Sequence, residues 1–227
     1  MRRFHPVLGV AALVAASWIT APAAPAADAP AKADAPPATA PSTVPAADGF
    51  VSVFNGKDLT GWVLTGDVKA GVEGGSLVIQ DGNGLVRLEK LYGDFVLELE
   101  WKNRKAEKWD SGIFFRAEPT PAGDRWPAKY QVNLAAGTEG SLVGRLNGRA
   151  KGLAKGGEWN RIRLTVVGET AECEVNGKAA WKVEKITIPQ GIVGIQVEVP
   201  GGGQFEFRNL RMKATTPPVD DPAAGKK

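Results

Sequence analysis

Histidine and cysteine are nearly absent from this chain of 227 residues. The one histidine is His5 and the one cysteine is Cys173. His5 lies in the N-terminal segment that we predict below to be a cleaved signal peptide, so the mature protein would contain no histidine, which excludes a Ser-His or Cys-His nucleophile. A single cysteine excludes an internal disulfide and a cysteine-rich zinc site. Any chemistry then falls to carboxylates, amides, arginine, lysine, tyrosine or a hard cation held by oxygen. Cleavage of glycosidic bonds by carboxylates is one mechanism that this composition permits.

Long apolar runs are also lacking. The apolar stretch at residues 7–19 is shorter than the ~20 residues needed to span a bilayer. It follows Arg2 and Arg3 and precedes two Ala-Pro-Ala triplets at 21–26, which is the pattern of a secretory signal. We therefore predict that residues 1–26 are a cleaved signal peptide, that the mature protein is periplasmic or secreted, and that it keeps no membrane span.

Strong charge of one sign is missing as well. The whole chain carries a formal charge of +3, and removal of Arg2 and Arg3 leaves 26 basic against 25 acidic groups. Such a balance does not favour a nucleic-acid partner. Residues 27–49 are rich in Ala and Pro and residues 214–227 repeat that character, so we predict a disordered linker and a disordered tail around one domain at 50–213.

That domain shows the period-2 alternation of β-strands, with turn residues between the runs and no convincing helical period. The dipeptide Asn176-Gly177 is a strong hairpin signal. The segments with the strand pattern are 95–102, 113–116, 130–134, 161–166, 171–175, 192–199 and 205–212. Two layers of antiparallel strands bury so many one-sided strands most simply. We predict an all-β fold, a two-sheet antiparallel jelly-roll sandwich of roughly a dozen strands.

Short motifs in a fixed order resemble a known family. Residues 54–62 read Phe-Asn-Gly-Lys-Asp-Leu-Thr-Gly-Trp, and residues 110–116 read Asp-Ser-Gly-Ile-Phe-Phe-Arg. Further matching segments are 94–101, 157–160, 176–177, 194–196 and 207–209. Together they resemble the 3-keto-disaccharide hydrolase domain and span nearly all of 50–213. The resemblance implies a concanavalin A-like lectin/glucanase fold and hydrolysis of 3-keto-glucosides.

The chain departs from that family at several positions. The family has Asn where this chain has Asp110, and Glu and Gln where it has Gln131 and Asn133. An acidic residue is replaced at Ala135-Ala136, and residues 197–199 stand where the family often has histidine. The missing acid at Gln131 leaves open whether the chain is an enzyme, while Asp110 offers an acid in its place.

Polar side chains that alternate away from the core are the candidate site. They are Glu98, Glu100, Arg116, Gln131, Asn133, Gln196 and Glu198. If their strands share one sheet, they form a single surface of carboxylates, amides and a guanidinium, which suits sugar hydroxyls. Trp109 and Trp126 are candidates to stack on a sugar ring. The alternative is that these residues are only the solvated face of a sandwich.

Two mechanisms fit these residues. Glu100 and Asp110 would flank a glycosidic bond as acid and base or acid and nucleophile, with Arg116 stabilising an oxygen anion and Gln131 or Gln196 orienting the sugar. A 3-keto group also acidifies the neighbouring C–H, so elimination followed by hydration is a second route. The spacing indicates no metal site and no cofactor, although carboxylate and amide oxygens are compatible with calcium.

Three functions remain open at this level. The first is an exported glycoside hydrolase or lyase acting on an oligosaccharide or keto-glycoside. The second is a non-catalytic carbohydrate-binding module, favoured by the amides at Gln131 and Asn133. The third is an adhesion domain on a Pro/Ala tether.

Several other residues are predicted to be structural. Arg208 is expected to pair with a carboxylate at a strand end, and Cys173 to be a small buried hydrophobe. The tryptophans expected to pack in the core or at its edge are Trp62, Trp101, Trp159 and Trp181.

Overall fold

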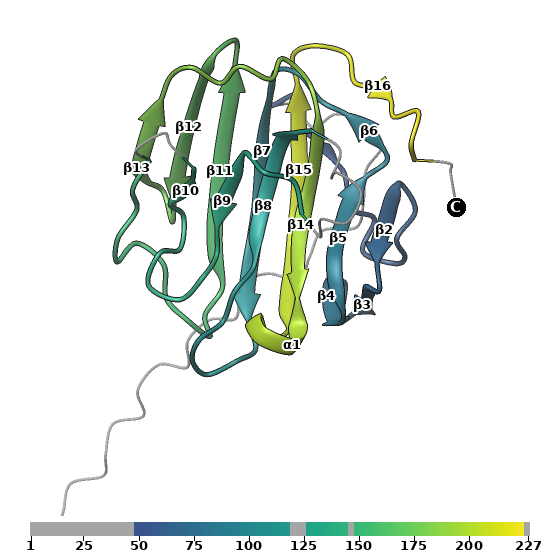
Figure 1. Ribbon diagram of the computed structural model, residues 1–227, viewed down its shortest axis with the longest axis vertical. Helices are drawn as coiled ribbons and strands as arrows, with labels where there is room; N and C mark the ends of the chain where they lie inside the picture. The colour runs from purple at the N-terminus through teal and green to yellow at the C-terminus, as the bar shows by residue number, and fades with distance from the viewer. Residues whose placement is uncertain (1–47, 119–125, 145–147, 225–227) are drawn as a thin grey trace, which may run out of the picture. The chain divides into compact units, whose positions relative to one another are not determined.

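The protein folds into two large antiparallel sheets (Figure 1). The computed structural model describes residues 48–118, 126–144 and 148–224. The predicted signal peptide and all but the last two residues of the predicted linker lie outside this part of the chain. Within it, no helix is long and apolar enough to cross a membrane.

One sheet has eight strands, in the order β13-β12-β11-β7-β15-β4-β3, with β1 paired to β15. Its strands are β1 (Val51–Ser52), β3 (Lys69–Glu73), β4 (Ser76–Asp81), β7 (Phe95–Asn103), β11 (Asn160–Val167), β12 (Thr170–Val175), β13 (Lys178–Val183) and β15 (Phe205–Ala214). The long central strands β7 and β15 pair over most of their length. They form the middle of this layer.

The other sheet has six strands, in the order β10-β9-β8-β14-β5-β2. Its strands are β2 (Trp62–Gly66), β5 (Asn83–Leu88), β8 (Gly112–Ala117), β9 (Gln131–Asn133), β10 (Leu142–Val143) and β14 (Ile192–Glu198). A single helical turn, α1 (Val199–Gly202), follows β14. It begins at the end of the sheet where the candidate site lies.

The core lies between the two sheets because each strand presents its apolar residues to the opposite sheet. On β7, Phe95, Leu97, Leu99 and Trp101 are all buried in this core. Ile113 and Phe115 on β8, together with β14 residues such as Ile195, face them from the six-stranded sheet. Because side chains alternate along a strand, the residues between these apolar positions point away from the core.

The predicted fold class is confirmed: the protein is an all-β antiparallel sandwich. The predicted hairpin at Asn176-Gly177 joins β12 to β13, and both residues have the positive φ that a type I′ turn requires. Cys173 is buried, as expected, and burial together with the nearby Glu174 raises the pKa of its thiol to about 12.

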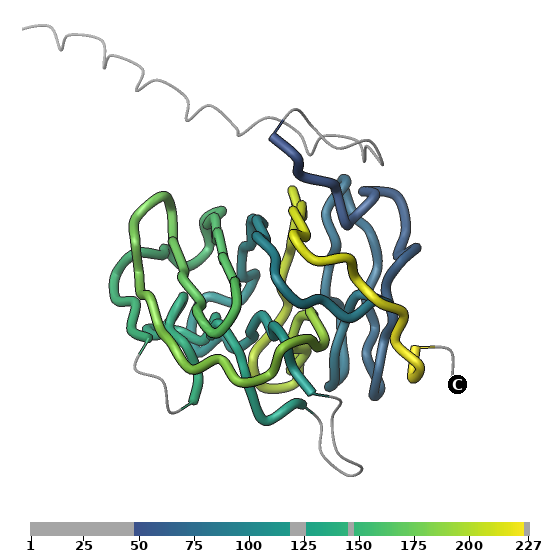
Figure 2. The backbone as a smooth tube through the Cα atoms, turned by 90° about the horizontal axis from the view of Figure 1, so that it is seen from above, coloured from purple at the N-terminus to yellow at the C-terminus, as the bar shows by residue number. Residues whose placement is uncertain are grey.

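The C-terminal segment differs from the predicted disordered tail. Residues 215–224 are placed, and β16 (Val219–Asp220) pairs with β6 (Lys90–Leu91). Beyond this small sheet, Asp221 forms a buried ion pair with Arg87 of β5. In both views the yellow C-terminal segment runs alongside the blue strands of the first half of the chain (Figures 1 and 2). The composition of this segment resembles that of a linker, but the pairing of β16 with β6 and the ion pair between Asp221 and Arg87 fix it to the rest of the domain.

Candidate functional site

A chain of polar side chains lies on the outer face of the six-stranded sheet. The amide of Gln131 on β9 donates to the amide oxygen of Gln196 on β14. The Gln196 amide then donates to a carboxylate oxygen of Glu198 at 2.9 Å. Gln131 and Gln196 are only 8% and 7% exposed, so both amides are held in one orientation. The sequence prediction that these three residues share a surface therefore agrees with the geometry.

Gly112 leaves space for this row of polar side chains. The outward side of Gly112 on β8 is covered by the Gln131 side chain, and a Cβ there would collide with it. Gln131 lies over Gly112 and so reaches across β8 to Gln196 on the strand beyond. Below this crossing, the Ser111 hydroxyl donates to the backbone oxygen of Gln196 at 2.8 Å. Ser111 was not among the predicted site residues, although it belongs to the 110–116 motif.

Asp110 brings a second carboxylate to the same end of the sheet. Its backbone N–H donates to the Gly202 carbonyl in α1 at 3.0 Å. The contact is so close that a Cβ on Gly202 would collide with the Asp110 backbone. Burial first, and then the negative charge of Glu198, raise the pKa of the Asp110 carboxyl, against a backbone hydrogen bond from Ser111 that lowers it. Glu198 directly precedes α1 and Asp110 bonds the last residue of α1, so the two carboxylates lie at the same end of the sheet.

Trp126 provides an apolar wall for this face. Its indole N–H donates to the Gly84 carbonyl of β5 at 3.0 Å. Its ring packs with an outward cluster on the six-stranded sheet that also contains Leu91. The buried members of this cluster are Leu85, Phe114, Ala117 and Ile192. An aromatic wall beside carboxylates and amides is a common composition for a sugar-binding site.

Asn133 is on the same sheet but is used locally. Its amide donates to the Thr138 hydroxyl at 2.9 Å and its oxygen accepts from the Ala135 N–H. These bonds shape the turn between β9 and β10. The residue lies at the edge of the candidate site, beside Gly112 in the strand register.

Glu100 lies on the other sheet. It points outward from β7 and accepts from Arg208 of β15 at 2.7 Å. The Arg208 guanidinium also stacks on Trp159, 3.9 Å from the ring centroid. The predicted pairing of Arg208 with a carboxylate is confirmed, and that pairing places Glu100 apart from Asp110. The single polar surface predicted from alternation is thus two surfaces on opposite sheets.

Arg116 is fully buried and joins three loops. Its guanidinium donates to the carbonyls of Gly93 and Gly168, more distantly to that of Ile188, and forms an ion pair with Asp94. A bulge in β8 opposite β14, where Arg116 has a φ of 43°, breaks the alternation at this position. The geometry gives Arg116 a structural setting at the far end of β8 from Asp110.

Trp109 packs inward. It is half-buried against the main core, and Gly156 leaves the space that its ring occupies. Its indole N–H is buried without a hydrogen-bond partner in the part of the chain that the structure describes. Of the two predicted stacking tryptophans, the structure brings only Trp126 to the outer face of the six-stranded sheet.

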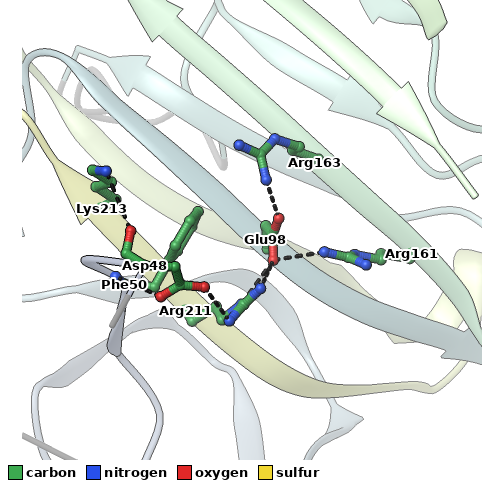
Figure 3. Close-up of polar contacts among 7 residues, drawn as sticks. All are labelled: Asp48, Phe50, Glu98, Arg161, Arg163, Arg211 and Lys213. Atoms are coloured by element: carbon green, nitrogen blue, oxygen red, sulfur yellow. Dashed lines mark hydrogen bonds and ion pairs between the residues drawn. The ribbon is translucent and has the colours of Figure 1, made fainter. Parts of the chain in front are cut away.

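The outer face of the eight-stranded sheet carries its own charged cluster around Glu98 (Figure 3). Arg161, Arg163 and Arg211 all bond its carboxylate, and Arg211 also pairs with Asp48 at 3.0 Å. Burial alone would raise the pKa of Glu98, but the hydrogen bonds and charges of Arg211 and Arg161 outweigh it and lower the pKa. A hollow of about 350 Å³ adjoins this cluster, lined by Arg161, Arg163, Glu174 and Gly177.

Metal ligands do not gather at either face. Among the described residues, no group of three or more His, Cys, Asp or Glu side chains could hold an ion.

These features agree with the sequence family. Residues 49–213 match the 3-keto-alpha-glucoside-1,2-lyase-like domain. The chain belongs to this family. Membership relates the protein to carbohydrate chemistry, and the matched segment covers nearly all of both sheets together with the predicted site residues. No curated protein is significantly similar to the chain in sequence.

Solved structures share the fold at low sequence identity. Two candidate glycosyl hydrolases from Parabacteroides distasonis have TM-scores of 0.58 and 0.62, with 21% and 18% identity. The alignments cover 75% and 73% of this chain and 95% and 98% of those chains. The carbohydrate-binding module CBM66 from Bacillus subtilis has a TM-score of 0.51 and 14% identity, with 68% of this chain and 96% of that chain covered. These structures support the lectin-like sandwich fold predicted from the sequence.

Proposed function

We propose that this protein is an exported enzyme that cleaves 3-keto-glycosides at the outer face of its six-stranded sheet. Family membership supports the substrate class, and the signal-like N-terminus supports export. The observation that carries the proposal is the pair formed by Asp110 and Glu198, where one carboxyl has a raised pKa beside the other charge. Two neighbouring carboxyl groups with different environments are the usual basis of an acid and a base in one site.

Asp110 would act as the acid and Glu198 as the base. Burial and the adjacent charge keep Asp110 protonated to higher pH than an ordinary aspartate, so it can give a proton to a departing glycosidic oxygen. Glu198 accepts a hydrogen bond from Gln196, which fixes the orientation of its carboxylate. Gln131 and Gln196 hold that orientation, and Trp126 offers a ring face to the sugar.

The 3-keto group makes elimination the simpler route. Glu198 removes the proton from carbon 2, which the neighbouring ketone acidifies, and the electron pair forms a double bond to carbon 1. The bond from carbon 1 to the glycosidic oxygen breaks, and Asp110 protonates that oxygen. Addition of water across the double bond then completes a net hydrolysis. This route needs no nucleophile from the protein, which fits the replacement of the family acid by Gln131.

Matched glutamate variants on the two sheets test the assignment. Glu198→Gln should lower turnover of a 3-keto-glucoside by about 100-fold or more, because it removes the base. Glu100→Gln makes the same chemical change on the opposite sheet and should leave turnover nearly unchanged. Asp110→Asn removes the acid and should therefore abolish most of the activity. The activity that remains should no longer fall at higher pH, where Asp110 of the unchanged protein loses its proton. Full activity in Glu198→Gln and loss in Glu100→Gln would contradict the assignment.

A carbohydrate-binding module is the second candidate. The two buried amides, Gln131 and Gln196, and the fold shared with a carbohydrate-binding module support it. Calorimetry separates the two functions: saturable binding of a glycoside without turnover of any 3-keto-glucoside would favour the module.

A further inference from the structure

The charged cluster around Glu98 borders a hollow that the proposed function leaves unused. The hollow, of about 350 Å³, lies on the outer face of the eight-stranded sheet and is lined by Arg161, Arg163, Glu174 and Gly177. Ligand pockets usually measure about 300–1,000 Å³, so this hollow has the size for a small molecule. Gly177 has a φ of 75° in the hairpin turn, and a Cβ there would meet no described atom within 4 Å. The hairpin therefore leaves its side of the hollow open.

Two arginines of β11 supply the positive charge of the hollow. Arg161 and Arg163 are about 7 Å apart along one strand and lie on its outer side, because Ile162 between them is buried in the core. Each approaches the Glu98 carboxylate through one nitrogen, and their side chains are 51% and 39% exposed. Among the described residues, neither guanidinium makes another hydrogen bond or ion pair. Since a guanidinium carries five N–H donors, most of these donors are free to bind a ligand.

The third arginine of the cluster shows what such donors bind. Arg211 on β15 uses all three nitrogens: Nε and Nη2 bond Glu98, and Nη1 bonds the Asp48 carboxylate at 3.0 Å (Figure 3). Asp48 precedes β1, so it is a second carboxylate that reaches the cluster from outside the sheet. In the described part of the chain, Arg161 and Arg163 have no equivalent second carboxylate.

Glu174 adds a hydrogen-bond acceptor on the neighbouring strand. It is exposed on β12, directly across from Arg163 in the strand register. Glu172, two residues earlier, pairs with Lys182 at 2.6 Å, whereas Glu174 forms no ion pair within the described ranges. A carboxylate accepts hydrogen bonds from hydroxyl groups. The hollow therefore offers donors for an anion and, beside them, an acceptor for hydroxyls.

We propose that this hollow binds a sugar acid, a pyranose that carries one carboxylate. The carboxylate accepts from Arg161 and Arg163 through the N–H donors that Glu98 leaves free, and a ring hydroxyl donates to Glu174. Guanidinium groups match the planar geometry of a carboxylate and form strong, charge-assisted hydrogen bonds with it. A carboxylate without hydroxyls lacks the bond to Glu174, and a neutral sugar lacks the charge. The site lies on the opposite sheet from the candidate catalytic pair and does not depend on the proposed function.

Calorimetry on the full chain with glucuronate and acetate tests the site. The unchanged protein should bind glucuronate about tenfold or more tightly than acetate. Arg161→Gln should weaken glucuronate binding by about tenfold or more, because it removes charge-assisted bonds while Arg163 and Arg211 still hold Glu98. Arg104→Gln makes the same change at a surface ion pair beyond the end of β7 and should leave the affinity unchanged.

A second variant tests the hydroxyl contact. Glu174→Ala should bring the ratio of the affinities for glucuronate and acetate close to one. Loss of the negative charge at this position acts alike on both carboxylates and cancels in that ratio. Arg161→Lys keeps a positive charge beside Glu98 and should recover part of the affinity that Arg161→Gln loses.

Three results would overturn the proposal. They are equal affinities of the unchanged protein for glucuronate and acetate, full glucuronate affinity in Arg161→Gln, and an equal loss in Arg104→Gln. Melting temperatures of the variants show whether any loss of affinity comes from unfolding. Turnover is not measured, so these outcomes are separate from failure of the catalytic pair.

Discussion

Asp110 shows how one side chain acquires its chemistry from its surroundings. The residue type is ordinary for a turn, and the sequence places it only before a strand. Packing of α1 against its backbone and the nearby Glu198 change its properties, because burial and a like charge both disfavour ionisation. The sequence could name the residue but not the direction of its pKa.

Stability against pH should report this environment. The pKa of Asp110 is raised above 3.8 in the folded protein, so the folded state binds the proton more tightly than the unfolded chain. Its contribution to the free energy of unfolding is therefore greatest at low pH and falls as pH rises through the raised pKa. Asp110→Asn should be more stable than the unchanged protein above that window and should lack this fall.

Denaturant unfolding at several pH values measures the effect. Asp81→Asn is a useful control because Asp81 is exposed and has a lowered pKa, chiefly from a hydrogen bond with Lys69. A stability gain for Asp110→Asn that is equal at low and neutral pH would contradict the assignment of the raised pKa.

At the scale of elements, strand β8 carries two different tasks. Its first residue, Gly112, lies under the Gln131 side chain. The bulge at its other end directs the Arg116 side chain inward, where it bonds the carbonyls of loops. Period-2 reasoning assumes an unbroken ladder, so it assigned Arg116 to the outer face with Gln131. The bulge is a tertiary feature, and the motif letters do not show it.

Loss of Arg116 should mainly affect stability. Arg116→Met keeps much of the side-chain volume but leaves Asp94 and the carbonyls of Gly93 and Gly168 without their donor. The free energy of unfolding should fall by about 3–5 kcal/mol. Chemical denaturation measures this change, and Arg104→Met, on an exposed ion pair of the other sheet, is the control.

If Arg116 instead contacted substrate, Arg116→Met would reduce turnover in protein that remains folded and as stable as the unchanged chain. The structure predicts instead that Arg116→Met lowers the free energy of unfolding and leaves the turnover of folded protein unchanged. Residual folded Arg116→Met protein should retain its affinity for the sugar.

Sequence patterns identified strands unevenly. Clean alternation predicted β7, β11 and β12, where one face is buried and the other is solvated. Strand β5 was not predicted, because Trp126 and the C-terminal segment cover its outer face and leave it buried on both sides. A strand covered on both faces loses the alternating pattern that marks a strand in sequence.

At the scale of the whole molecule, the two outer faces are separate surfaces. Glu98 with its arginines lies on the eight-stranded sheet (Figure 3). Asp110 and Glu198 lie at one end of the six-stranded sheet. The core lies between the two faces, so a change on one face should not reach the other directly.

Glu98→Gln tests this separation. The variant leaves three arginines around a neutral amide, and the free energy of unfolding should fall by about 2 kcal/mol at neutral pH. Because the pKa of Glu98 is lowered in the folded state, its contribution is present above the unfolded value of 4.5 and is lost as pH falls through the lowered pKa. The stability difference should shrink accordingly in acid, while glycoside affinity at pH 7 stays unchanged.

The sequence by itself determined the fold class, the family and the shortage of histidine and cysteine that leaves chemistry to carboxylates and amides. These follow from local patterns and composition, which need no knowledge of distant contacts. Only the tertiary structure decided that Glu100 and Glu198 occupy different sheets and that Asp221 reaches Arg87. Strand order, a bulge and a docked terminus bring together residues far apart in the chain, and alternation along one strand carries no information about which strand lies beside it.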